Sequence, residues 1–155
     1  MIVEWSILAE GMTQDARGAL TVVGLAQTVG MAPKLPLAVK RAAIILLTGD
    51  NEEFIAGRPV NFSLKIEGPS GQIVCENQGV TPIAPNPFPD LPFGVTIAGE
   101  VAFIAHEYGR YVLTIEVQPV DHPRLEAKMN FYILAVAGHF DGVATSTSSG
   151  TGSFV

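Results

Sequence analysis

The sequence predicts an all-β protein: an antiparallel, jelly-roll-like β-sandwich of about eight strands, with a long proline-rich crossing and an extended C-terminal tail. Three observations carry this prediction. Apolar and polar residues alternate with a period of two in several segments. Glycine and proline separate these segments, and no long window follows the helical period of 3.6. Many short strands with turn signals between them are typical of a sandwich or a barrel.

The alternation is clearest in three segments, 60–67, 110–117 and 124–134. Their inward-facing residues are expected to be Val60, Phe62, Leu64, Ile66, Tyr111, Leu113, Ile115, Val117, Leu125, Ala127, Met129, Phe131 and Ile133. Charged and small polar residues occupy the positions between them. This pattern is typical of strands that bury one face.

The other strands are expected at 2–10, 19–29, 37–48, 72–77 and 94–104. Segment 42–47, "AAIILL", is apolar at every position, which predicts a central strand covered on both faces. Segments 2–10 and 19–29 form a predicted N-terminal pair, and Trp5 is expected to face the core. The motifs "GPSG" and "QPVDHP" predict turns, and a single helical turn capped by Asp50 is expected near 50–56.

Composition limits the class of function. Charged residues make up 15% of the chain, against about 25% in an average soluble domain, so its polar surface is thin and apolar contact with other protein is expected. The net charge of −6 and the scattered basic residues argue against nucleic acid and anionic membranes. The N-terminus lacks a basic segment and the longest apolar run is short, so neither a signal peptide nor a transmembrane segment is predicted. These features predict a cytoplasmic or virion protein.

The stretch 80–94, "VTPIAPNPFPDLPFG", is unusual because prolines alternate with large apolar residues. A solvated linker would contain more serine, glycine and glutamate. A ligand for a proline-reading domain would need a longer exposed run with a basic neighbour. We therefore predict an ordered crossing between the two sheets, whose apolar residues cover an open edge of this chain or of a neighbour.

The chain is expected to divide into a β-sandwich domain, 1–137, and a tail rich in glycine, serine and threonine, 138–155. Phe154 and Val155, at the end of the tail, are expected to anchor it. The candidate interface therefore combines residues of the crossing and the tail: Pro85, Pro87, Phe88, Leu91, Phe93, Phe140, Phe154 and Val155.

No residue pattern identifies a reaction. His106, His122 and His139 lie far apart in predicted turns or in the tail, without metal-ligand spacing. Cys75 alternates into a strand and is expected to be a small buried hydrophobe. The acidic segment 49–53 lacks the ordered spacing of a calcium loop. We predict no enzyme, no cofactor and no metal.

Several motifs resemble a family of short, uncharacterised bacterial and phage β-sandwich proteins, a domain of unknown function. They are "WSILAEG", "GALTVVG", the prolines at 33–36, the "GPSG" hairpin and "GRYVLTIEV", and they span roughly 1–134. The resemblance implies the sandwich fold. It implies no catalytic residues, because the family has none that are accepted. The proline-rich crossing and the tail depart from the family pattern.

Two functional hypotheses follow. The first is a non-catalytic building block that self-assembles or docks on other proteins in a larger assembly, a phage virion being one candidate. The second is a module that binds a small molecule or carbohydrate, with Phe88, Phe93, Tyr108 or Tyr132 as an aromatic platform. An enzyme would require a pocket that brings His106 or His122 beside a carboxylate.

Overall fold

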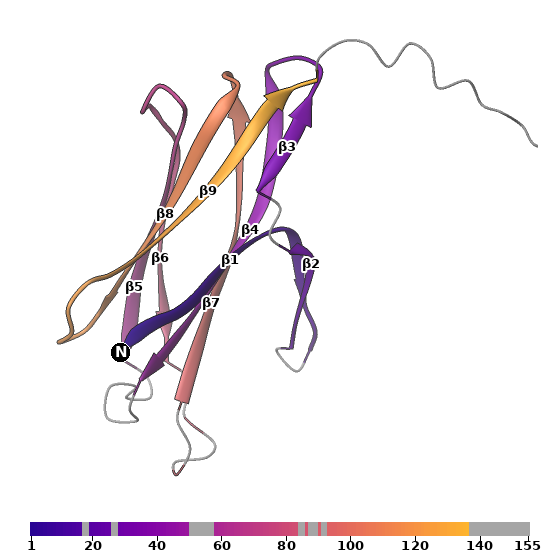
Figure 1. Ribbon diagram of the computed structural model, residues 1–155. Helices are drawn as coiled ribbons and strands as arrows, with labels where there is room; N and C mark the ends of the chain where they lie inside the picture. Colours follow the sequence, from indigo (N-terminus) through magenta and orange to yellow (C-terminus); the bar gives the residue numbers. More distant parts are fainter. Residues whose placement is uncertain are drawn as a thin grey trace, which may run out of the picture.

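The protein is a β-sandwich of two packed sheets, shown in Figure 1. A computed structural model describes residues 1–16, 19–25, 28–49, 58–83, 86, 90 and 93–136, with the side chain of Phe93 outside this description. The described residues form nine strands and no helix. The predicted sandwich is therefore confirmed. The helical turn expected at 50–56 lies outside the described residues.

The four-stranded sheet has the order β2-β1-β4-β7, and the five-stranded sheet has the order β3-β9-β8-β5-β6. The strands are β1 (Ile2–Gln14), β2 (Leu20–Leu25), β3 (Val29–Ala32), β4 (Leu37–Gly49), β5 (Pro59–Glu67), β6 (Ile73–Pro82), β7 (Phe93–Ala105), β8 (Gly109–Pro119) and β9 (Leu125–Ala135). All pairs are antiparallel except β3–β9, which is parallel.

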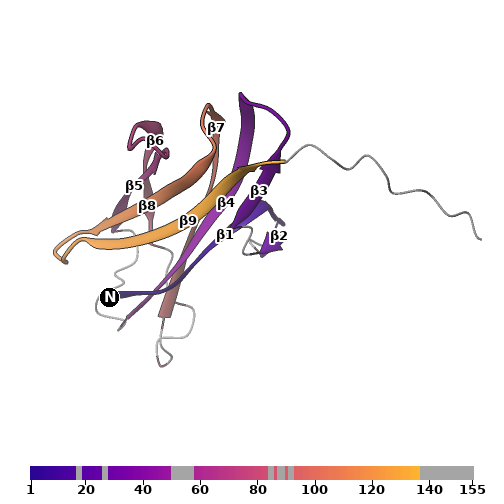
Figure 2. The same cartoon turned by 45° about the horizontal axis from the view of Figure 1, so that its top comes forward.

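The segment predicted as one strand at 19–29 contributes to two strands in different sheets. β2 pairs with β1 in the four-stranded sheet, whereas β3 pairs with β9 in the five-stranded sheet. Figures 1 and 2 show β2 at the edge of the four-stranded sheet, on the side away from β5 and β6. Gly24 has a φ of +66°, and a Cβ there would lie 2.6 Å from Cγ of Glu10, so only glycine suits this bend.

The proline-rich stretch joins the two sheets, as predicted, because it leads from β6 to β7. Its first residues, 80–82, extend β6 beyond the predicted end at residue 77. Ile83 is buried in the chain's own core, and its amide donates a hydrogen bond to the carbonyl of Arg58. The beginning of the crossing therefore covers the core of the same chain.

Both predicted hairpin turns are confirmed. At 68–71 the amide of Gly68 donates to the carbonyl of Gln72 at 2.8 Å, and Gly71 has a φ of +80°. At 118–123 the chain turns between β8 and β9 with Asp121 at a φ of +64°. Asparagine and aspartate tolerate this region better than other non-glycine residues.

The core lies between the two sheets and uses the predicted inward positions of β5, β8 and β9. At its centre the rings of Tyr111 and Phe131 stack at 5.4 Å, and Phe103 packs against both. The Tyr111 hydroxyl donates a 2.7 Å hydrogen bond to the carbonyl of Glu107, which satisfies its polar group. Segment 42–47 is buried at nearly every position, and β4 is a central strand as predicted.

Trp5 is a correction to the sequence analysis, because its side chain is 40% exposed rather than in the core. A β-bulge between Val3 and Trp5 shifts the register of β1 against β4. Val3 pairs with Leu47 and packs against the core, whereas Trp5 pairs with Leu46 on the outer face. A bulge adds one residue and so turns every later side chain of the strand to the other face.

Candidate functional site

The residues predicted as the interface lie outside the part of the chain that the structure describes. They are Pro85, Pro87, Phe88, Leu91, Phe140, Phe154 and Val155, together with the side chain of Phe93, whose backbone begins β7. The structure therefore brings none of them into a described site. It shows two other surfaces, both on the outer face of the five-stranded sheet.

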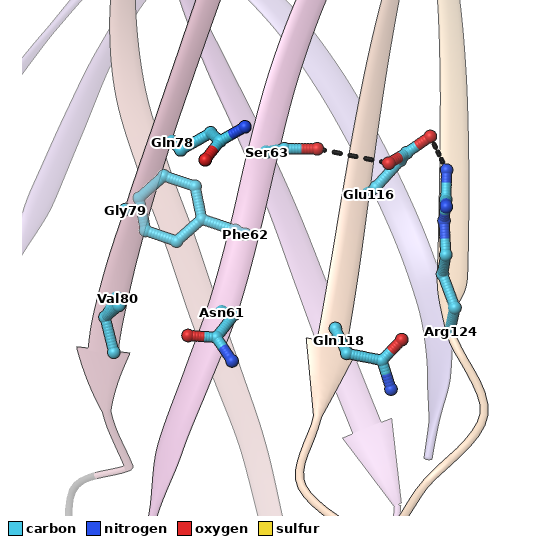
Figure 3. Close-up of a pocket in the computed structure, with 9 residues that line it drawn as sticks. All are labelled: Asn61, Phe62, Ser63, Gln78, Gly79, Val80, Glu116, Gln118 and Arg124. Atoms are coloured by element: carbon cyan, nitrogen blue, oxygen red, sulfur yellow. Dashed lines mark hydrogen bonds and ion pairs between the residues drawn. The ribbon is translucent and has the colours of Figure 1, made fainter.

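The first surface is a groove of about 430 Å³ that combines polar side chains with apolar surface, shown in Figure 3. It crosses β6, β5 and β8 and ends at the start of β9. Its lining residues are Asn61, Phe62, Ser63, Gln78, Gly79, Val80, Glu116, Gln118 and Arg124. The cross-strand pairs Ser63–Gln78, Ser63–Glu116 and Asn61–Gln118 place polar side chains from three strands next to one another.

Glu116 is the centre of the hydrogen bonding in the groove. Ser63 donates its hydroxyl to Oε2 of Glu116 at 3.2 Å, and Arg124 forms an ion pair with Oε1. Both carboxylate oxygens are therefore engaged, as Figure 3 shows. Because Glu116 and Arg124 are the charged residues of the lining, their charges cancel and the groove is neutral.

The amide side chains of the groove differ in how they are held. Gln118 donates from Nε2 to the carbonyls of Pro119 and His122, at 3.2 and 2.9 Å. This contact fixes the orientation of the amide and leaves its oxygen as an acceptor. Asn61 and Gln78 are exposed and form no side-chain hydrogen bond with the described residues. Their donors and acceptors are available to a ligand.

Gly79 determines the shape of the groove at β6, the edge strand of the sheet. The ring of Phe62 lies across Gly79, where a Cβ would come within 2.4 Å of Cζ of that ring. Figure 3 shows the ring beside the glycine. A side chain at residue 79 would displace the ring, so the wall of the groove depends on this glycine.

The second surface is apolar and lies at the opposite edge of the same sheet. We call it the β3 edge patch, and it consists of Val29, Met31, Tyr108, Tyr132 and Leu134, which are between 38% and 65% exposed. The parallel register pairs Val29 with Tyr132 and Met31 with Leu134. The Tyr108 hydroxyl donates to the carbonyl of Ala32 at 3.4 Å, so its side chain spans β9.

The backbone of β3 presents an open edge beside this patch. The carbonyls of Thr28 and Ala32 accept hydrogen bonds from the amides of Tyr132 and Val136 in and after β9. In a parallel ladder the polar groups of alternate residues point to the same side, so those of Val29 and Met31 point to the edge. Segment 19–33, which contains β2 and β3, has no charged residue. Charges and prolines normally protect edge strands, and β3 has neither.

A charged strip separates the two surfaces and crosses β5, β8 and β9. It contains two short ion pairs, Lys65 with Glu67 at 2.6 Å and Lys128 with Glu126 at 2.8 Å. In each pair the hydrogen bond from the lysine lowers the pKa of the glutamate. Each charge of these pairs therefore has a partner of opposite sign within the strip.

The sequence analysis also considered histidines and Cys75, and the structure gives the surroundings of His106 and Cys75. His106 lines a cavity of about 360 Å³ beside Glu107, Ser70 and Tyr111. The carboxylate of Glu107, however, accepts a hydrogen bond from the amide of Ser70 at 3.1 Å and so belongs to the hairpin. Among the described residues, no group of three or more His, Cys, Asp or Glu is placed to hold a metal ion. Burial raises the pKa of the Cys75 thiol, which makes it a poorer nucleophile.

The groove was missed in the sequence analysis, although its residues gave one signal. Asn61, Ser63, Gln78, Glu116 and Gln118 all occupy polar positions of predicted or extended strands. Apart from Glu116, these residues are uncharged and can form hydrogen bonds. This was the signal in the sequence that could have indicated the groove. Tyr108 and Tyr132, named there as platform residues, are brought together in the β3 edge patch.

Comparisons with known proteins provide limited further information. No protein-family model and no curated protein sequence matches the chain. One solved structure that it resembles is the crystal structure of the C-terminal domain of Wzt, with 10% sequence identity and a TM-score of 0.44. The match covers 97% of this chain and 83% of that one. No helix of the described part is long and apolar enough to cross a membrane.

Proposed function

We propose that the protein is a non-catalytic interaction module that associates with a second copy of itself through the β3 edge patch. The observation that carries the proposal is the position of five exposed apolar side chains beside an edge strand without charge. Exposed apolar patches of this kind mark interaction sites in soluble proteins. We also propose, more broadly, that the protein is a component of a larger assembly, of which a virion is one candidate.

Strand addition is the mode of association that suits this edge. An extended segment that pairs with β3 would bond to the outward groups of Val29 and Met31. If the segment is β3 of a second copy, a two-fold axis places the strands antiparallel and continues the five-stranded sheet into its counterpart. If the axis passes beside Gly30, the patches of both copies meet on one face, where Val29 of each copy lies opposite Met31 of the other.

A second copy suits this edge better than a charged partner, because two uncharged apolar edges can pack against each other. Segment 19–33 contains no charge, so two copies meet there without like-charge repulsion despite the net charge of −6. The strand is short, with four residues. Its contact area is therefore well below the roughly 1,600 Å² of a standard interface, and we expect a dimer that dissociates at concentrations on the order of micromolar.

Light scattering on the full-length chain across a dilution series tests this proposal. The expected result is twice the chain mass of 16.4 kDa at high concentration and the single mass after dilution. Met31→Lys places a charge in the patch and should yield a monomer throughout. The matched control is Val120→Lys, which changes an exposed apolar residue of the β8–β9 turn and should leave the dimer intact.

Two results would contradict the proposal. A monomer at every concentration would exclude self-association. A dimer that persists in Met31→Lys, with circular dichroism unchanged, would place the contact at another surface. In contrast, loss of the dimer in both lysine variants would indicate a general effect of added positive charge rather than a contact at β3.

A further inference from the structure

We infer that the groove across β6, β5 and β8 is a binding site for a neutral, hydroxyl-rich ligand such as an oligosaccharide. This site is separate from the β3 edge patch and does not depend on self-association. Its volume, about 430 Å³, lies within the usual range of ligand pockets. The class of ligand follows from the charges, the hydrogen-bonding groups and the apolar wall of the groove.

The charge balance of the groove favours a neutral ligand over an ionic one. Glu116 and Arg124 neutralise each other inside the groove, and Ser63 occupies the second oxygen of the carboxylate. A phosphate or carboxylate ligand would have to separate Arg124 from Glu116 and leave a charge without its partner. A cation would have to displace both Arg124 and Ser63. A neutral ligand leaves this network intact.

The remaining polar groups match hydroxyl groups. Asn61 and Gln78 each present an amide with two N–H donors and one oxygen acceptor, and Gln118 presents its oxygen in a fixed orientation. A hydroxyl both donates and accepts, so neighbouring hydroxyls can bond to an amide through both its oxygen and its nitrogen. Figure 3 shows the three amides on adjacent strands around the middle of the groove.

Val80 supplies an apolar contact on the same wall. Its side chain is 63% exposed and is the cross-strand neighbour of Asn61. A sugar ring has apolar C–H faces as well as hydroxyls, so it can contact Val80 while it bonds to the amides. A small inorganic ion would leave this apolar surface unused.

Nuclear magnetic resonance titration of the ¹⁵N-labelled full-length chain tests the inference. The probes are maltotetraose and cellotetraose as neutral ligands, and an oligogalacturonate as the acidic ligand. We expect at least one neutral probe to cause saturable shifts of the side-chain NH₂ signals of Asn61 and Gln78 at millimolar concentration. The acidic probe should bind about tenfold more weakly or not at all.

Variants locate the site. Gln78→Ala removes one free amide and should lower the affinity for the neutral probe about tenfold. Gln72→Ala is the matched control, because it removes an exposed amide from the hairpin at the other end of β6 and should leave the affinity unchanged. Arg124→Gln should raise the affinity for cations, because Glu116 would lose its partner.

Three outcomes would overturn the inference. One is the absence of saturable shifts with both neutral probes, and another is a stronger response to the acidic probe. The third is a set of shifts that maps outside the groove or that Gln78→Ala leaves unchanged. Because Met31→Lys does not touch the groove, the same titration on that variant separates failure of this site from failure of self-association.

Discussion

The two surfaces on the outer face of the five-stranded sheet differ in nearly every property. The groove crosses β6, β5 and β8, is lined by polar side chains and contains a neutralised ion pair. The β3 edge patch is apolar, and the segment that contains β2 and β3 has no charge. The groove presents side chains on the face of the sheet, whereas the patch presents side chains together with the unpaired backbone groups of an open edge.

This difference is the basis for proposing two kinds of recognition on one scaffold. On the face of a sheet, each side chain contributes its own hydrogen-bond donors and acceptors. A groove that contains amide side chains therefore offers a specific set of hydrogen bonds. An open edge offers the regular spacing of a strand and accepts another strand with little discrimination. The charged strip across β5, β8 and β9 lies between the two surfaces.

The largest expected effect is destabilisation of the core that supports both surfaces. Phe131→Ala removes a ring that is buried between the sheets and stacked on Tyr111 at 5.4 Å. We expect a loss of about 3–5 kcal/mol in the free energy of unfolding, because a large cavity remains. Urea denaturation measures the loss, and Phe131→Leu should lose less. A change below about 1 kcal/mol would contradict the central place of this ring in the core.

The second effect concerns Gly79 and the Phe62 ring beside it, which lines the groove and also packs against the core. Gly79→Ala brings a Cβ within 2.4 Å of Cζ of Phe62, so the ring must move, and we expect destabilisation of about 1–3 kcal/mol. The matched control is Gly99→Ala, where no atom lies within 4 Å of the new Cβ. Adding Phe62→Leu to Gly79→Ala should recover part of the loss. Equal stabilities for the two alanine variants would show that the ring does not pack on Gly79.

Much of the fold could be predicted from local patterns, and the exceptions have physical causes. Alternation identifies a strand but not its partner, so segment 19–29 read as one strand although β2 and β3 belong to different sheets. The bulge in β1 exposes Trp5, and no residue in "MIVEWSIL" announces it. The crossing between sheets was predictable because proline-rich apolar segments rarely form strands.

The candidate site was harder to predict than the fold. Each groove residue, taken alone, is a polar residue at a solvent-facing strand position. The groove exists only because β6, β5 and β8 are neighbours, which long-range pairing determines. The edge patch also combines β3 with β9, more than ninety residues away in the chain. The predicted interface residues of the crossing and tail lie outside the described residues and stay a prediction.

A smaller effect on stability is expected from the Tyr111 hydroxyl. Tyr111→Phe removes the hydroxyl that donates to Glu107, next to Tyr108, and should cost about 1 kcal/mol at neutral pH. Burial raises the pKa of Tyr111, so the folded state retains the proton after the unfolded state has lost it. Stability is therefore fully present below the ordinary tyrosine pKa of about 10 and falls as the pH rises toward the raised value.

Thermal unfolding from neutral to strongly alkaline pH measures this dependence. The alkaline decline should be smaller in Tyr111→Phe than in the parent chain. The control is Tyr132→Phe, which removes a half-exposed hydroxyl without a hydrogen bond to the described residues and should leave the neutral-pH stability unchanged. An identical decline in Tyr111→Phe and the parent would show that another group causes it.

The smallest effect lies in the charged strip between the two surfaces. Lys128 lowers the pKa of Glu126 mainly through its hydrogen bond, so Lys128→Gln should move that pKa back toward its ordinary range. A lowered pKa contributes stability above the ordinary glutamate pKa, and this contribution is lost as the pH falls through the lowered value. Because the pair is exposed, solvent screens it and unfolding at neutral pH should hardly change.

Carboxyl ¹³C titration by nuclear magnetic resonance resolves this shift. Lys65→Gln is the control, because Lys65 acts on Glu67 and is not among the causes of the Glu126 shift. If Lys128→Gln leaves the Glu126 titration unchanged, the strip is not locally paired. The Lys128–Glu126 contact at 2.8 Å would then not persist in solution, and the strip would present separate charges between the groove and the β3 edge patch.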